Sequence, residues 1–216
     1  MAGGSFAQFL DRNYRYQRHI YDFTREYYLL GRDTLIAGLA TPEGGSILEI
    51  GCGTARNLIL ASERYPHADL YGIDLSRAML ETAQRKLAHR GLLQRIHLGY
   101  ADAVEFRPQE LFGREAFDRI FFSYSISMIP AWQKALRHAA SLLTPQGSLH
   151  IVDFGRGCDL PRALDWALDA WLQRFHVTRR LDLQPELRRI AGEIGGDLYF
   201  AELYRSYAAY AVLRLR

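Results

Sequence analysis

Residues 47–57, Ile-Leu-Glu-Ile-Gly-Cys-Gly-Thr-Ala-Arg-Asn, are an apolar run that ends in two glycines around one residue. The pattern is typical of a strand that breaks into a tight turn and opens a helix from Thr54. Gly51 and Gly53 allow positive φ angles and a close approach of the backbone to a ligand, and a helix start directs free N–H groups to the same place. The stretch predicts a nucleoside-binding loop, although a plain turn that needs glycine only for its own geometry has the same pattern.

Two kinds of nucleotide cofactor compete for this loop. A dinucleotide fingerprint requires a third glycine three residues after the second, and Arg56 occupies that position. Glu49 stands just before the turn, where a carboxylate balances the ammonium and sulfonium charges of S-adenosylmethionine. The spacing therefore favours S-adenosylmethionine, with an NAD-dependent dehydrogenase as the weaker alternative.

Two further acids extend the predicted site. Asp74 ends an expected strand at 69–74 and follows Gly53 at close to the ~20-residue offset at which a carboxylate binds ribose hydroxyls. Asp102 follows a third expected strand at 96–99 and is placed to accept a hydrogen bond from an exocyclic amine such as that of adenine. A helix cap or a polar loop residue is the competing role for Asp102.

Composition bounds the class of protein. The chain has 216 residues, 49% of them hydrophobic, and a net charge of +3 that is not gathered in one block. This suits one α/β domain, residues 1–216, and does not demand a nucleic-acid partner. Cys52 and Cys158 fit neither a zinc spacing nor a disulfide framework, and we expect no metal. Neither a membrane span of ~20 apolar residues nor a signal peptide is evident, so we expect a soluble, cytoplasmic protein.

Strands and helices alternate along the chain. The alternation implies right-handed crossovers and a doubly wound, mostly parallel sheet, with ligands bound at the carboxyl ends of its strands. The last two strands are expected to form an antiparallel hairpin at the sheet edge. Beyond the strands already named, we expect strands at 117–124, 148–154, 197–204 and 206–214, and helices at 32–39, 54–64, 76–89, 130–143 and 164–175.

The segments at 6–30 and 164–175 are rich in aromatic residues. The first predicts one or two helices ahead of the first strand, packed on the sheet edge with snorkelling arginines. The same residues could instead form a helical lid, residues 1–40, whose tyrosines line a substrate pocket and whose outer face touches lipid. For Trp166 and Trp171 in the second segment, core packing and contact with a bilayer interface are likewise both open.

Four motifs resemble those of class I S-adenosylmethionine-dependent methyltransferases. They are residues 47–54, 71–76, Asp102 and 142–148, in the family's order and at its usual spacings. The resemblance implies a Rossmann-like methyltransferase fold with a seven-stranded sheet and S-adenosyl-L-methionine as cofactor. One departure is Ala55, where the family usually has a third glycine; we expect its methyl group to be tolerated while tightening the approach to the amino-acid end of the cofactor.

The resemblance also implies the cofactor-binding residues. Glu49, Gly51 and Gly53 would lie near the methionine portion, Asp74 at the ribose, and Ala101 with Asp102 at the adenine. Tyr21 and Arg32 are candidates for the cofactor carboxylate, and Ser123 for the strand-four edge of the pocket. The full predicted set is Tyr21, Arg32, Glu49, Gly51, Cys52, Gly53, Asp74, Leu75, Ala101, Asp102 and Ser123.

A narrower resemblance lies outside these motifs. Residues 14–22, 27–33, 127–130, 150–155 and 174–178 resemble the bacterial diacylglyceryl-homoserine N-methyltransferases. That family implies successive methylation of a lipid headgroup amine to the trimethylated betaine lipid. It also implies transient contact with the inner membrane surface, and as a partner the 3-amino-3-carboxypropyl transferase that makes the substrate.

The reaction itself suggests catalytic candidates. Methyl transfer to an amine is an in-line displacement that needs alignment more than a nucleophile or a metal, and its increasingly methylated ammonium product favours aromatic faces. We therefore name Tyr16, Tyr21 and Tyr124 as catalytic candidates, with packing as the competing role for each, and His19, His150 and Asp153 as possible proton acceptors. Two other functions stay open: methylation of a soluble amine, phenol or quinone precursor, and a cofactor-binding but non-catalytic subunit.

Overall fold

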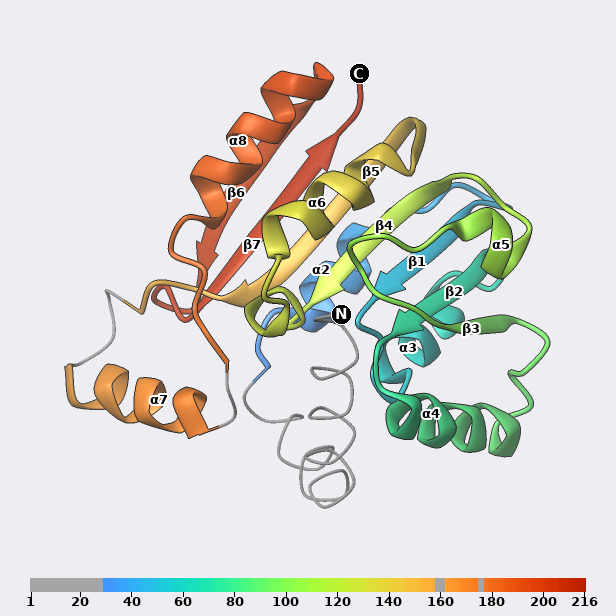
Figure 1. Ribbon diagram of the computed structural model, residues 1–216, viewed down its shortest axis with the longest axis horizontal. Coiled ribbons are helices and arrows are strands. Elements are labelled where there is room, and N and C mark those ends of the chain that lie inside the picture. The colour runs from blue at the N-terminus through green and yellow to red at the C-terminus, as the bar shows by residue number, and fades with distance from the viewer. Residues whose placement is uncertain (1–28, 158–161, 175–176) are drawn as a thin grey trace.

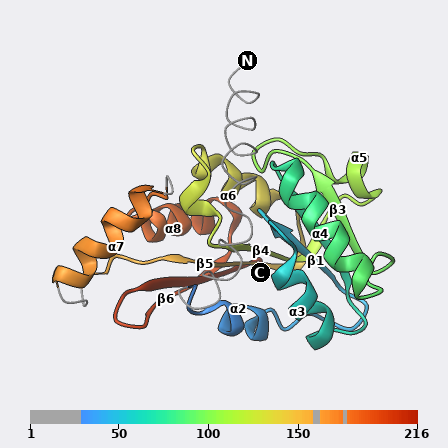
Figure 2. The same cartoon turned by 90° about the horizontal axis from the view of Figure 1, so that it is seen from below.

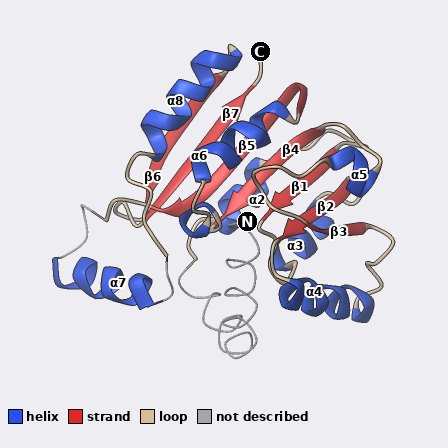
Figure 3. Cartoon of the chain, viewed as in Figure 1, coloured by secondary structure: helices blue, strands red, loops and turns tan. Residues whose placement is uncertain are grey.

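The computed structural model describes residues 29–157, 162–174 and 177–216, and these residues build one sheet with helices on both faces (Figures 1 and 3). The strand order is β3-β2-β1-β4-β5-β7-β6. β1 to β5 are parallel, and β7 runs antiparallel to both β5 and β6. The doubly wound sheet with an antiparallel hairpin is confirmed. The strands are β1 Ser46–Ile50, β2 Asp69–Asp74, β3 Ile96–Tyr100, β4 Phe117–Ser123, β5 Leu143–Phe154, β6 Asp197–Leu203 and β7 Ala208–Arg214.

Helices fall close to their expected positions, with two additions. α3 begins at Arg56 and not at Thr54, and α6 begins at Trp132 because a 3-10 turn, Ile126–Met128, precedes it. The short α5 and the longer α8 were not predicted. The helices are α2 Arg32–Gly38, α3 Arg56–Arg64, α4 Arg77–His89, α5 Pro108–Phe112, α6 Trp132–Ser141, α7 Arg162–Arg174 and α8 Leu183–Ile194.

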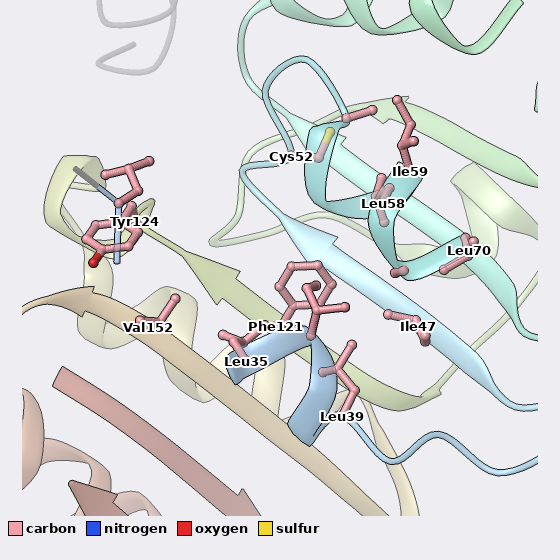
Figure 4. Packing of buried hydrophobic residues seen from close by; sticks show 14 of the residues in the cluster. Leu35, Leu39, Ile47, Cys52, Leu58, Ile59, Leu70, Phe121, Tyr124 and Val152 are labelled. Atoms are coloured by element: carbon pink, nitrogen blue, oxygen red, sulfur yellow. The ribbon is translucent and has the colours of Figure 1, made fainter. Parts of the chain in front are cut away.

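Apolar side chains cover both faces of the sheet. On one face Leu35 of α2 and Leu58 of α3 pack with Ile47 of β1 and Phe121 of β4 (Figure 4). On the opposite face α6 and α8 pack over the sheet (Figure 2). All five residues of β1 are buried, as expected for a central parallel strand. Each fully buried aliphatic side chain contributes about 1.5–3 kcal/mol, so the core holds the ends of the strands in fixed positions.

The strand order reverses between β1 and β4, since β2 and β3 lie on one side of this pair and β5 on the other. Ligands of such sheets bind outside the carboxyl ends of the strands at the reversal. Residues 51–55 follow β1, and residues 124–129 follow β4. The region outside these two segments, which we call the crevice, is therefore the expected ligand site.

The β6–β7 turn lies at the same edge of the sheet, because Leu203 and Ala208 pair with each other and Ala208 also pairs with Phe154 at the end of β5. Three successive non-glycine residues of this turn, at 204–206, have φ angles of 54°, 55° and 59°. Each left-handed residue costs roughly 1–2 kcal/mol. Hydrogen bonds from the amides of Gly155 and Gly157 to carbonyl oxygens of this turn hold it in place.

The structure describes only the last part of the predicted lid, residues 1–40. Residues 1–28 lie outside the described residues, and residues 32–38 form α2 as expected. In the described part of the chain, no helix combines the length and apolarity that a membrane span requires.

Candidate cofactor and acceptor site

The loop after β1 has the geometry that the glycines predict. Gly51 and Gly53 have φ angles of 77° and 53°, and the amides of Gly51 and Cys52 both donate to the carbonyl of Ile73, at 2.9 and 3.0 Å. A Cβ on Gly51 would lie 2.6 Å from Cβ of Ser125, so space and conformation both require glycine there. Among the described residues, a Cβ on Gly53 would meet no atom within 4 Å, so these residues leave open space at Gly53.

Asp74 is fixed beside this opening. Its Oδ2 accepts a hydrogen bond from the amide of Gly53 at 2.8 Å, and its Oδ1 accepts one from the amide of Ser76 at 2.8 Å. A carboxylate oxygen has two lone pairs, so each can also accept a hydrogen bond from a ribose hydroxyl. The structure thus brings the two predicted cofactor residues, Gly53 and Asp74, into direct contact.

Glu49 lies at the end of β1 and is 1% exposed. Its Oε1 accepts a hydrogen bond of 2.7 Å from Nδ2 of Asn57 in the first turn of α3. This contact orients the carboxylate that is predicted to balance the cofactor's positive charges. Asn57 was not among the predicted residues, although it lies within residues 47–57, one helical turn beyond the glycines.

Cys52 contributes through its backbone and its packing. Burial raises the pKa of its thiol well above the ordinary value, and the charges of Asp74 and Glu49 raise it further. The thiol therefore stays protonated at neutral pH and is a poor nucleophile.

The conformation and burial of Ala55 bear on its presence at the position where the family usually has a third glycine. It has φ 61° and ψ 23° at the start of α3 and is fully buried. A left-handed alanine costs roughly 1–2 kcal/mol, while the buried methyl group returns about 0.8 kcal/mol. The buried methyl group therefore offsets part of the conformational cost of an alanine at a position that favours glycine.

The predicted adenine side is built from the ends of β2 and β3. The amide of Ala101 donates to the carbonyl of Asp74 at 3.1 Å, and Oδ1 of Asp102 accepts from the amide of Val104 at 2.9 Å. Asp102 thus caps its own loop through one oxygen, and its adenine contact stays a prediction that the second oxygen could serve. Leu75 directly follows β2 and is half-buried.

Ser123 and Tyr124 lie at the carboxyl end of β4. The Ser123 hydroxyl oxygen is inaccessible and has no hydrogen-bond partner among the described residues. The Tyr124 hydroxyl donates to the carbonyl of Leu30 at 2.6 Å, its ring packs edge-on against Phe154 with centroids 4.8 Å apart, and it is 2% exposed. Burial raises the pKa of Tyr124 far above its ordinary value. The hydrogen bond of this hydroxyl therefore joins the end of β4 to the segment before α2. The catalytic role of Tyr124 stays a prediction.

The remaining predicted residues are placed as follows. Arg32 opens α2, is 9% exposed and donates from Nε to the carbonyl of Leu29 at 3.1 Å. Tyr16 and Tyr21 lie outside the described residues, as does His19. Their roles stay predictions. Across residues 29–157, 162–174 and 177–216, no group of three or more acidic, histidine or cysteine side chains is arranged to hold a metal ion.

His150, considered above as a proton acceptor, lies in the core and not in the crevice. It is 0% exposed, and its Nε2 lies 2.8 Å from Oγ of Ser148. Burial, with the positive charges of Arg119 and Arg214, lowers the pKa of His150 to about 3. The ring is therefore neutral at physiological pH and has no access to a substrate.

This burial makes stability depend on pH. The unfolded histidine titrates near pH 6.5 and the folded one at about 3, so the stabilisation is complete above pH 6.5 and is lost as the pH falls toward 3. We expect this residue alone to lower the free energy of unfolding by about 2 kcal/mol between pH 7 and pH 5. Urea unfolding of wild type and His150→Gln at both values measures it. Equal pH dependence in the two proteins would contradict the prediction.

Comparison with known proteins assigns the central part of the chain. Residues 47–147 match the family model described as a methyltransferase domain. The match shows that this part of the chain is similar to a methyltransferase domain. S-adenosylmethionine is accordingly the cofactor of this domain, and the glycine loop, Glu49 and Asp74 fit it. The match ends before most of β5 and does not include the segments after it.

Curated relatives and solved structures agree with this domain. Trans-aconitate 2-methyltransferase from Escherichia coli (strain 55989) is 29% identical over 134 residues, which are 62% of this chain and 43% of that enzyme. The chain thus spans less than half the length of this relative. A SAM-dependent methyltransferase from Aquifex aeolicus has a TM-score of 0.64 at 16% identity, over 89% of this chain and 93% of that one. The methyltransferase SibL has a TM-score of 0.70 at 19% identity, over 91% and 57%. These two structures support the class I methyltransferase fold.

Proposed function

We propose that this protein transfers a methyl group from S-adenosylmethionine to a small organic acceptor in the crevice between the ends of β1 and β4. The observation that carries the proposal is the hydrogen bond from the Gly53 amide to Asp74, set beside open space at Gly53. A ribose-binding carboxylate and a backbone that a ligand can approach closely are thereby combined at the reversal of strand order.

The chain's own residues would bind and align the reactants. The bound cofactor supplies an activated methyl group on a sulfonium. Glu49, buried and oriented by Asn57, balances positive charge at the end of β1. Asp74 would hold the ribose, and Ser123 would border the pocket at the end of β4. Alignment at near-attack distance can supply roughly 7–11 kcal/mol, so no metal or covalent nucleophile is required.

The test separates binding from transfer. Calorimetry of the purified protein with S-adenosylmethionine and with NAD measures cofactor choice. Incubation with methyl-labelled S-adenosylmethionine and a panel of trans-aconitate, soluble amines, phenols and quinone precursors, with products resolved by mass, measures transfer. We expect S-adenosylmethionine to bind and one soluble acceptor to be labelled. Binding without transfer to any acceptor would favour a non-catalytic subunit, and preferential NAD binding would favour a dehydrogenase.

A second candidate is N-methylation of diacylglyceryl-homoserine at a membrane surface. It is favoured by four large apolar residues exposed on segments near the carboxyl edge of the sheet: Leu30, Trp166, Leu181 and Tyr204, at 37%, 74%, 59% and 51% exposure. Such residues suit insertion into a lipid interface. This candidate adds the 3-amino-3-carboxypropyl transferase as a partner and a peripheral position at the inner membrane.

The lipid candidate has its own assay. Diacylglyceryl-homoserine in mixed micelles is added to the panel above, and vesicle co-sedimentation compares wild type with Trp166→Glu. Mono-, di- and trimethylated lipid, with weaker vesicle binding of the variant, would favour this candidate. Label on a soluble acceptor alone, with no vesicle binding, would exclude it.

A further inference from the structure

The segment Ser125–Ile129, which we call the acceptor loop, forms the β4 side of the crevice. Ser125 Oγ donates to the carbonyl of Ile50 at 2.8 Å, and Ser125 packs directly against Gly51. The acceptor loop therefore contacts the glycine loop after β1, residues 51–55, which we call the cofactor loop. With the acceptor beside this loop, as the proposed function has it, a shift of the loop would change the distance between the acceptor and the methyl group.

Two charged residues from outside the matched residues 47–147 hold this loop. From β5, Asp153 is 2% exposed and its Oδ2 accepts from the amide of Ser127 at 3.0 Å. From the segment after α7, Arg180 donates to three carbonyl oxygens of the loop, those of Ile126, Ser127 and Ile129, at 3.2, 3.4 and 2.9 Å. The guanidinium also lies over the ring of Trp132 at 5.9 Å from its centroid.

The residues on either side of Arg180 fix where it stands. The amide of Thr178 donates to the carbonyl of Ser127 at 3.0 Å. Arg179, in contrast, contacts α7. It pairs with Asp165 and Asp169 of α7 at 2.8 and 3.0 Å, and it donates to the carbonyl of Arg156 at 2.9 Å. Adjacent arginines thus connect α7 on one side with the acceptor loop on the other.

A planar guanidinium suits this task, because its fixed donors can satisfy several carbonyl oxygens at once while an ammonium acts as a point charge. Loops that carry binding residues need such support, because a misplacement of about 1 Å can cost about 100-fold in rate. Arg180 supplies this support to the acceptor loop, although Arg180 itself lies neither in the glycine loop nor at the end of a parallel strand.

We propose that Arg180 is a positioning residue of the methyl-transfer site, which holds the acceptor loop at the distance from the cofactor loop that transfer requires. Asp153 supports the same loop from the sheet. The inference rests on the proposed function for its kinetic consequence, whereas its structural consequence can be measured without any acceptor.

The experiment compares wild type, Arg180→Gln, Arg180→Lys and the control Arg189→Gln. Arg189 lies on the exposed face of α8 and pairs only with Glu186 and Glu193 among the described residues. Hydrogen exchange is followed in peptides spanning 124–131. Affinity for S-adenosylmethionine is measured by calorimetry, and kcat and KM with whichever of trans-aconitate and micellar diacylglyceryl-homoserine the wild type methylates.

We expect Arg180→Gln to speed loop exchange at least tenfold and to lower kcat/KM for the acceptor at least tenfold, with cofactor affinity within twofold of wild type. Arg180→Lys should recover part of both effects, and Arg189→Gln should match wild type. Unchanged loop exchange in Arg180→Gln would overturn the inference. So would equal losses in cofactor affinity and acceptor kinetics, which indicate a merely structural role. A wild type that binds no S-adenosylmethionine would instead overturn the proposed function, and the exchange result would still decide the role of Arg180.

Discussion

Replacing Gly53 by alanine is expected to weaken S-adenosylmethionine binding about 100-fold while lowering the free energy of unfolding by only about 1–2 kcal/mol. Among the described residues the added Cβ would meet no atom within 4 Å, so within this part of the chain its cost to folding comes from φ 53° alone. The same methyl group would occupy the space through which a cofactor approaches the backbone. Calorimetric titration and urea unfolding of the variant measure the two effects separately.

Gly113 provides a matched control. It has φ 65°, and a Cβ added to it would likewise meet no atom of the described residues within 4 Å. It ends α5 and lies far from the glycine loop in sequence. Gly113→Ala should therefore lose a similar free energy of unfolding and keep wild-type cofactor affinity. If both variants bind the cofactor as tightly as wild type, the opening at Gly53 is not the cofactor site.

Asp74→Ala is expected to weaken S-adenosylmethionine binding by at least about 100-fold. Hydrogen bonds to a charged group contribute about 1.5–3 kcal/mol each, and the variant loses the predicted bonds to two ribose hydroxyls. It also leaves the amides of Gly53 and Ser76 without the carboxylate to which they donate, so the loop itself becomes less well ordered. Calorimetric titration with S-adenosylmethionine measures the loss.

Asp118 supplies the corresponding control at the opposite edge of the sheet. Its carboxylate accepts from the amide and hydroxyl of Ser46, both at 2.8 Å, and from the hydroxyl of Thr144 at 3.0 Å. Asp118→Ala should lower stability and leave cofactor affinity within twofold of wild type. Equal loss of affinity in both variants would show that Asp74 acts through stability and not through the ribose.

Much of the fold could be predicted because the central strands are short apolar runs that end in turn residues. Asp69–Asp74 is found with its predicted bounds, and Arg32–Gly38 differs by one residue from prediction. The site residues that follow β1 and β2 could be predicted for the same reason. In a parallel sheet, the residues just after strand ends share one edge, so Gly53 and Asp74 could be placed together before any contact was known.

Other features depend on contacts that spacing does not encode. α5 has only five residues and no room for a periodic pattern. α8 does carry one, with Leu183, Leu187, Ile190 and Ala191 buried, and helical periodicity could have found it. The contacts of Arg180 join residues more than 50 positions apart, and no local pattern distinguishes such an arginine from one in solvent. The burial of His150 and Tyr124 likewise depends on strands from distant parts of the chain.

The position of β7 bears on how the protein is made. Ala208–Arg214 leaves the ribosome after every other described strand, yet it lies between β5 and β6 in the finished sheet. Until it arrives, the backbone donors and acceptors along one side of β5 have no partner, and an unpaired strand edge can join another chain. The glycine loop and Asp74 can be assembled well before that moment. Nascent chains that already contain the cofactor residues are thus expected to remain prone to aggregation until the last strand is inserted.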